Sequence, residues 1–150
     1  MSEAGTYTLV FAVPDPISVE VGALGVRELS AGAYAYTGSA LGAGGFSRID
    51  RHRRVAAGEH DVRHWHVDYL GGHEAVSLPA VERLSGGRDE ECRLACTVAD
   101  AAAERDPVAG FGASDCDCAS HLARFEGVAA AESSVTAAYD GLREHDAIRE

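Results

Sequence analysis

Residues 6–13 read Thr-Tyr-Thr-Leu-Val-Phe-Ala-Val, a run of β-branched, aromatic and aliphatic side chains. Side chains of these kinds favour extended backbone, so the run predicts a strand buried in the core. Pro14-Asp15-Pro16 follows immediately and is typical of a tight turn. Because residues 17–21 then alternate between apolar and polar side chains, we expect them to form the hairpin partner of the first strand.

The rest of the chain alternates between strand-like, loop-like and helical segments. The small side chains of residues 38–45 predict a flexible loop, because none of them could hold a core together. Residues 88–103 carry the clearest helical pattern, an apolar stripe formed by Cys92, Ala95, Cys96 and Ala99. We also expect a loop or turn at 22–32, a strand at 33–37, helices at 46–57 and 64–70, a strand at 75–84 that Pro79 places at a sheet edge, a loop at 108–118, a short helix or strand at 119–125, and a polar helix or frayed tail at 127–150.

These elements predict the fold class. We expect an α/β fold, in which a small, mainly antiparallel central sheet of three or more strands is flanked by the helices at 46–57 and 88–103. The chain has 150 residues, a length that suits one compact domain. Residues 1–125 would form this domain, and residues 126–150 would be its C-terminal helix or tail.

The formal net charge is −11, and the chain contains no lysine, so all thirteen basic residues are arginines. Net acidity argues against nucleic-acid binding, since phosphate contacts require positive charge. The segment from Arg27 to His66 differs, because it holds six of the arginines and only four acids. Abundant Asp, Glu and Ala without Lys is also typical of proteins adapted to high salt, in which the acidity reflects the solvent and says little about the ligand.

Neither a membrane segment nor a secretion signal is expected. No apolar run approaches the roughly 20 residues that a membrane helix needs. The first residues, Met1-Ser2-Glu3-Ala4, lack a basic region followed by an apolar stretch. We therefore expect a soluble cytoplasmic protein with no membrane partner.

Four features occur in an order that resembles the GIY-YIG nuclease family. Gly5-Thr6-Tyr7 and Tyr36-Thr37-Gly38 stand where the two motifs of the family belong, each on an expected strand. A small-residue loop follows, and then Arg48-Ile49-Asp50-Arg51-His52 places an Arg-x-x-x-His pattern on a helix. Glu91 opens a later helix, where the metal-binding glutamate of the family lies. Two departures are that both central motif positions carry threonine where isoleucine is usual, and that the gap between the motifs is long.

Two further blocks resemble a narrower group. Residues 64–70, His-Trp-His-Val-Asp-Tyr-Leu, and residues 110–122 look like the signature blocks of an uncharacterised, mainly archaeal GIY-YIG-like subfamily. Its members sometimes occur fused to a base-excision glycosylase of the endonuclease III type. This similarity implies a role in DNA repair, and with it DNA rather than RNA as the partner.

The family resemblance implies a metal-dependent nuclease that hydrolyses phosphodiester bonds, with one divalent ion, Mg²⁺ or Mn²⁺, as cofactor. Glu91 would bind this ion, and Arg48 would hold the scissile phosphate with its planar fork of donors. Tyr7 or Tyr36 would orient the attacking water or act as general base, and His52, one helical turn after Arg48, would assist proton transfer. We expect the two tyrosines to lie on neighbouring strands of one sheet, with their hydroxyls opening onto a common cleft.

Each of these residues also has an ordinary role open to it. Tyr7 and Tyr36 could simply pack in strands, Glu91 could be an exposed acid in the first turn of a helix, Arg48 a solvated charge, and His52 a second phosphate contact. A non-catalytic nucleic-acid or protein binding module that retains the fold is therefore the rival to the enzyme, and the net acidity favours it.

The densest basic run supplies the expected nucleic-acid contacts. It consists of Arg48, Arg51, Arg53 and Arg54. Because phosphate contacts require arginine or lysine, we expect Arg51, Arg53 and Arg54 to bind the nucleic-acid backbone.

The four cysteines, Cys92, Cys96, Cys116 and Cys118, are too few and too clustered for a disulfide framework. Cys116 and Cys118, with His121 and Cys92, could form a structural zinc site, although their spacing differs from the usual paired pattern. Buried or surface thiols are the stronger expectation, because Cys92 and Cys96 fit an apolar helical stripe, and a catalytic thiol is the remaining alternative.

Overall fold

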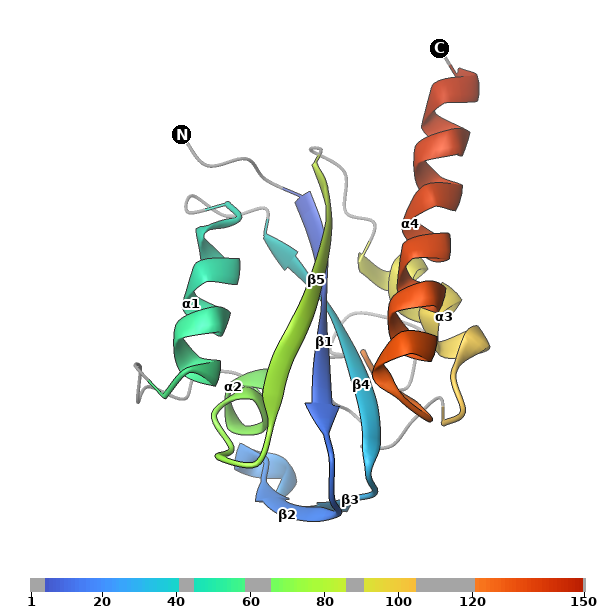
Figure 1. The fold of residues 1–150 in the computed structure, drawn as a ribbon. Helices are drawn as coiled ribbons and strands as arrows, with labels where there is room; N and C mark the ends of the chain where they lie inside the picture. Colours follow the sequence, from blue (N-terminus) through green and yellow to red (C-terminus); the bar gives the residue numbers. More distant parts are fainter. Residues whose placement is uncertain (1–4, 41–44, 59–65, 86–90, 105–120, 150) are drawn as a thin grey trace.

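The computed structural model describes residues 5–40, 45–58, 66–85, 91–104 and 121–149. Its main sheet has four strands in the order β5-β1-β4-β6, and every neighbouring pair is antiparallel (Figure 1). The strands are β1 (Gly5–Val13), β4 (Gly32–Ala40), β5 (Ser77–Ser85) and β6 (Leu122–Phe125). The expected α/β class with a mainly antiparallel sheet is confirmed, and so is the place of the Pro79 strand at an edge.

The prediction that residues 17–21 form the hairpin partner of β1 is wrong. β2 (Ile17–Glu20) pairs with β3 (Val26–Leu29) in a separate two-stranded sheet, and the 3-10 helix η1 (Gly22–Leu24) joins them. A strand therefore lies within residues 22–32, where we expected only a loop or turn. Both edges of β1 are taken by β4 and β5, and an alternating pattern indicates a half-buried strand without naming its partner.

The small residues after the second tyrosine motif also differ from expectation, because β4 continues to Ala40. Gly38 lies opposite Tyr7 in the sheet. A Cβ atom at Gly38 would lie 2.8 Å from the Tyr7 hydroxyl and 3.0 Å from the Tyr36 ring. The glycine is thus a strand residue over which two rings pack, and it does not mark the start of a flexible loop.

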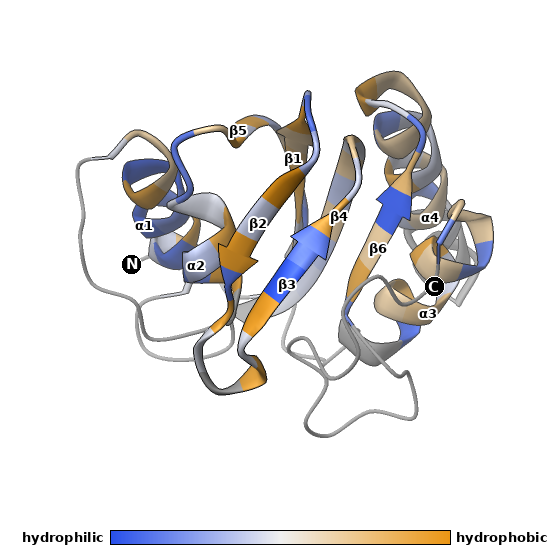
Figure 2. Cartoon of the chain, turned by 90° about the horizontal axis from the view of Figure 1, so that it is seen from below, coloured by the Kyte–Doolittle hydropathy of each residue, from blue (hydrophilic) through white to orange (hydrophobic). Residues whose placement is uncertain are grey.

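Helices cover both faces of the main sheet (Figure 1). α1 (Ser47–Ala56) and α2 (His66–Gly71) lie on one face, and α3 (Glu91–Ala101) and α4 (Val128–Arg149) lie on the other. Figure 2 shows this division from the end of the sheet that carries the β2–β3 hairpin. The expected helices near 46–57, 64–70 and 88–103 are present, residues 122–125 form a strand, and the C-terminal segment is helical.

Alternate residues of β1 point into two separate cores. Tyr7, Leu9 and Phe11 pack with α1 and α2, together with Tyr34 and Tyr36 of β4. We call this side of the sheet the tyrosine face. Even-numbered residues such as Val10 pack with α3 and α4 on the opposite face. None of the helices in the described ranges is both long and apolar enough to cross a bilayer.

Candidate active site

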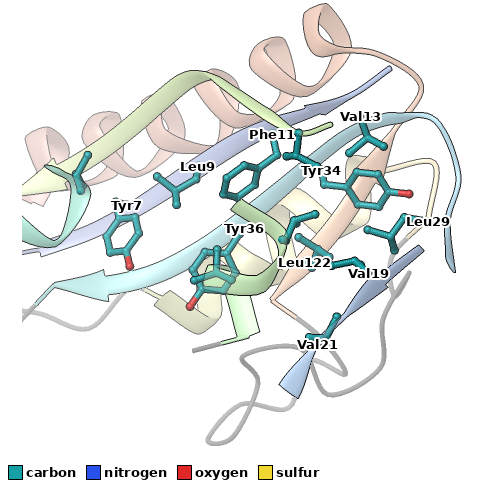
Figure 3. Close-up of a cluster of buried hydrophobic side chains, with 14 of the residues drawn as sticks. Tyr7, Leu9, Phe11, Val13, Val19, Val21, Leu29, Tyr34, Tyr36 and Leu122 are labelled. Atoms are coloured by element: carbon teal, nitrogen blue, oxygen red, sulfur yellow. The ribbon is translucent and has the colours of Figure 1, made fainter. Parts of the chain in front are cut away.

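Tyr7 and Tyr36 lie on the neighbouring strands β1 and β4 and on the same face of the sheet, as expected. Tyr36 pairs with Leu9, so it lies diagonally from Tyr7, and the two ring centres are 6.5 Å apart. Figure 3 shows both hydroxyls pointing the same way, whereas Tyr34 extends toward the other end of the core. We expected the hydroxyls to open onto a common cleft, but Tyr7 is buried. Tyr7 is 1% exposed and Tyr36 is 9% exposed. α1 packs over this face and supplies the group that the Tyr7 hydroxyl meets.

That group is His52, which α1 buries together with Ile49 and Val55. A hydrogen bond of 2.8 Å joins the Tyr7 hydroxyl to His52 Nε2, and the ring centres lie 5.4 Å apart. The pKa of His52 is lowered to about 4, chiefly by burial; the charge of Asp68 opposes this shift, and the charges of Arg51 and Arg48 add to it. His52 is therefore neutral at neutral pH. Its burial against Tyr7 favours the proton-transfer role over a second phosphate contact.

Asp68 on α2 completes this group, and the sequence did not single it out. Its side chain has 0% exposure, and its two oxygens accept hydrogen bonds of 2.8 and 2.9 Å from Arg51 Nη1 and Nη2. Its sequence signals were its place between the apolar residues Val67 and Tyr69 and within the 64–70 block that resembles a subfamily signature. The guanidinium of Arg51, expected to contact nucleic acid, is instead directed at this buried carboxylate.

The remaining arginines of α1 lie closer to solvent. Arg48 is half-buried, Arg54 is exposed, and the side chain of Arg53 is 58% exposed, with Nη1 3.6 Å from Asp50. Arg83 on β5 joins them, although no sequence motif includes it. It is exposed, lies opposite Tyr7 in the sheet, and its guanidinium carbon is 5.2 Å from the centre of the Phe46 ring. We call Arg48, Arg53, Arg54 and Arg83 the arginine set.

The proposed metal ligand lies on a helix that packs against the other face of the sheet. Glu91 is the first residue of α3, which packs on the opposite face, and its side chain lies outside the described part of the chain. Within the described ranges no group of three or more His, Cys, Asp or Glu side chains could hold a metal ion. Asp68, the buried acid on the tyrosine face, is engaged by Arg51 through both oxygens. The described side chains therefore do not form a divalent-ion site, and Glu91 stays a prediction.

The state of Cys96, the cysteine whose side chain the structure describes, differs from our expectation. Cys96 on α3 is disulfide-bonded, although we expected reduced thiols or zinc ligands. The number of cysteines can argue against a framework of several disulfides. It cannot exclude a single disulfide, which needs only two thiols that the fold brings together. Cys116, Cys118 and the side chain of Cys92 lie outside the described residues. His121 is buried, and its backbone carbonyl accepts a hydrogen bond from the Thr37 amide at 3.1 Å.

Comparison with known families places the chain in one family. A family model described as a domain of unknown function, DUF123, matches residues 6–144, from β1 through most of α4. The chain belongs to this family, which is GIY-YIG-like. The resemblance based on the two tyrosine motifs is confirmed at this level. No curated protein and no solved structure matches the chain.

Proposed function

We propose that this chain is a metal-dependent nuclease that hydrolyses phosphodiester bonds in nucleic acid, with DNA as the partner in a repair process. One observation carries the proposal: the Tyr7 hydroxyl is hydrogen-bonded at 2.8 Å to a buried neutral histidine, beside a second tyrosine on the next strand. The narrower similarity to archaeal proteins fused to glycosylases supports the repair role.

In the proposed reaction, Tyr7 acts as a general base that His52 activates. The Tyr7 proton passes to His52 Nε2 in the same step in which the Tyr7 oxygen takes a proton from the attacking water, because a separate phenolate beside a histidine with a pKa of about 4 is strongly disfavoured. The electron pair of that water forms the new P–O bond while the bond to the leaving oxygen breaks, and the proton on Nε2 passes to the leaving oxygen through solvent. A tyrosine with an ordinary pKa of about 10 keeps its proton at neutral pH, so it needs an acceptor for that proton during this step.

Tyr36, the less buried of the two tyrosines, is assigned to orient the water. Arg48 is assigned to the scissile phosphate, because its guanidinium can form two parallel hydrogen bonds with phosphate oxygens. The exposed members of the arginine set would contact the flanking backbone. Glu91 is kept as the ligand of one Mg²⁺ or Mn²⁺ ion, which when bound would neutralise charge on the phosphate.

The rival is a non-catalytic binding module, and two observations favour it. Tyr7 and His52 are 1% and 3% exposed, so a water molecule reaches them only if the surrounding side chains move. The net charge of −11 also opposes tight nucleic-acid binding at low salt. Both observations agree equally with a hydrogen-bonded pair that serves only to fix α1 on the sheet.

The two functions are separated by comparing Tyr7→Phe with Tyr34→Phe. Both tyrosines are buried on the same face; the Tyr7 hydroxyl is hydrogen-bonded to His52, and the Tyr34 hydroxyl donates to the Ser30 carbonyl at 2.7 Å. Loss of general-base catalysis should lower cleavage by about 10²- to 10⁴-fold in Tyr7→Phe, and Tyr34→Phe should cut like the wild type. Melting temperatures would show whether the two changes disturb folding equally.

The assay should use supercoiled, branched and single-stranded DNA, with Mg²⁺, Mn²⁺ or chelator, from low to molar salt. Wild-type protein that binds but never cuts in any of these conditions would support the rival. In the enzyme, Glu91→Gln should lose cleavage and keep metal-free binding, because one carboxylate that repels phosphate is gone. Cleavage undiminished in Glu91→Gln would show that another group holds the ion.

A further inference from the structure

Packing alone does not explain why the charged side chain of Asp68 is buried. A carboxylate with 0% exposure pays a large desolvation penalty unless it is paired. Arg51 compensates for this penalty with two hydrogen bonds, and it does so from α1, the helix that carries His52. The ion pair thus joins α2 to the turn of α1 that also presents the imidazole to Tyr7.

The carboxylate also faces the imidazole. Asp68 Oδ1 lies 3.9 Å from His52 Nδ1, on the side of the ring away from Tyr7. This separation is too long for a direct hydrogen bond, so the carboxylate acts on the ring through its electric field. Because both side chains are buried, solvent screens that field only weakly.

The field of Asp68 favours one of the two positions for the ring proton. A neutral imidazole has one N–H donor and one acceptor nitrogen. The negative charge of Asp68 favours the proton on Nδ1, which leaves the lone pair of Nε2 toward Tyr7. In the other tautomer Nε2–H would donate to the Tyr7 oxygen, and His52 could not accept the Tyr7 proton.

We propose that Asp68 is a positioning residue that, held by Arg51, fixes His52 as the proton acceptor of Tyr7. This inference rests on the proposed nuclease function and adds a residue to its machinery. When the Tyr7 proton moves to Nε2, His52 becomes an imidazolium and Asp68 stabilises its charge, while the carboxylate itself stays ionised. Arg51 is thereby assigned to Asp68 instead of to the nucleic acid.

Among the described residues, several charged or titratable groups face the imidazole. They include Tyr7 on β1, Asp68 on α2, and Arg51 and Arg48 on α1. Asp68 alone among these named groups raises the pKa of His52. Removing its charge should therefore lower that pKa below its wild-type value, while removing either arginine should raise it.

The test is ¹⁵N NMR of histidine-labelled protein, which distinguishes the two neutral tautomers directly. The His52 signals are assigned by their loss in His52→Gln. At neutral pH the wild-type ring should carry its proton on Nδ1. In Asp68→Asn, which keeps the shape and removes the charge, the population should shift toward Nε2–H. Asp50→Asn is the matched control, because it removes an exposed carboxylate of α1 and should leave the tautomer unchanged.

Kinetics supply a second readout. Asp68 touches no substrate, so Asp68→Asn should lower kcat by about 10- to 100-fold with little change in KM, as for other residues that orient a reacting group. Arg51→Gln should do the same. If Arg51 bound phosphate, its replacement would raise KM instead, and the positioning role would be overturned.

The outcomes also separate this inference from the nuclease proposal. A wild-type His52 with its proton on Nε2 overturns the positioning role, even if the protein cuts DNA and even if Asp68→Asn does not fold. The expected tautomer shift in a protein that cuts nothing supports the positioning role and overturns the nuclease.

Discussion

At the scale of single residues, Gly38 determines how closely Tyr7 can approach β4. Replacing it with alanine would place Cβ 2.8 Å from the Tyr7 hydroxyl and 2.9 Å from the carbon that bears it. We expect Gly38→Ala to push the ring off His52, to cost about 1–3 kcal/mol of stability, and to lower cleavage. Gly141→Ala is the control, since nothing lies within 4 Å of its Cβ position and alanine favours the α4 helix. Equal melting temperatures for the two variants would contradict this account.

The low pKa of His52 predicts a pH dependence of stability. Because burial lowers this pKa from 6.5 to about 4, the unfolded chain binds a proton between these values that the folded chain does not. The free energy of unfolding should therefore be highest above pH 6.5 and should fall by about 3 kcal/mol as the pH drops to 4. Urea unfolding measured at several pH values would show the slope. His52→Gln should flatten it, and an unchanged slope would mean that His52 is not the group responsible.

At the scale of elements, threonines fix α4 against the sheet. Thr8 Oγ1 lies 2.9 Å from Thr37 Oγ1 and 2.8 Å from the Tyr139 hydroxyl of α4, and all three side chains are buried. Thr6 is buried on the same strand, and its hydroxyl has no hydrogen-bond partner among the described residues. Thr37, the threonine in the second tyrosine motif, therefore contributes a hydrogen bond. Thr6, the threonine in the first motif, has a buried hydroxyl without a partner among the described residues.

This difference predicts opposite effects for one chemical change. Thr8→Val removes two hydrogen bonds and should destabilise the protein by about 1–2 kcal/mol. Thr6→Val keeps the β-branched shape and removes an unpaired polar group, so it should leave stability unchanged or raise it by up to about 1 kcal/mol. Thermal unfolding of the two variants gives the answer. Destabilisation of equal size in both would show that Thr6 also has a partner.

Local patterns explain which elements could be predicted. The buried strand at 6–13 and the helix at 46–57 follow from side-chain periodicity, which needs only neighbouring residues. The pairing of β2 with β3 could not be predicted, because an alternating strand fits several partners. Likewise the approach of Arg51 to Asp68, and of Arg83 to Tyr7, depends on how separate elements meet. The sequence motifs therefore indicated Tyr7, Tyr36 and His52, whereas only the fold showed that Asp68 and Arg83 lie near them.

At the scale of the whole molecule, the arginine set gathers four positive charges on α1 and β5 of an acidic protein. Arg83 extends the arginine set of α1 onto the edge strand β5. If nucleic acid lies there, Arg83→Gln should weaken binding for all sequences and reduce the salt slope by about one phosphate contact. Arg27→Gln is the control, because Arg27 is exposed on the separate β2–β3 hairpin. Equal effects of the two changes on affinity titrations would place the nucleic acid elsewhere.

The strand order also has a consequence for synthesis of the protein. β1 is the earliest strand in the chain, yet its two neighbours are β4, which is complete at Ala40, and β5, which begins only at Ser77. At roughly 5–20 residues per second on the ribosome, one edge of this apolar strand waits on the order of several seconds for its partner. During that time it exposes unpaired backbone groups, the condition under which strands pair with other chains. Growing chains stalled before residue 77 should therefore bind chaperones that recognise extended apolar segments, and chains released after residue 85 should bind them less.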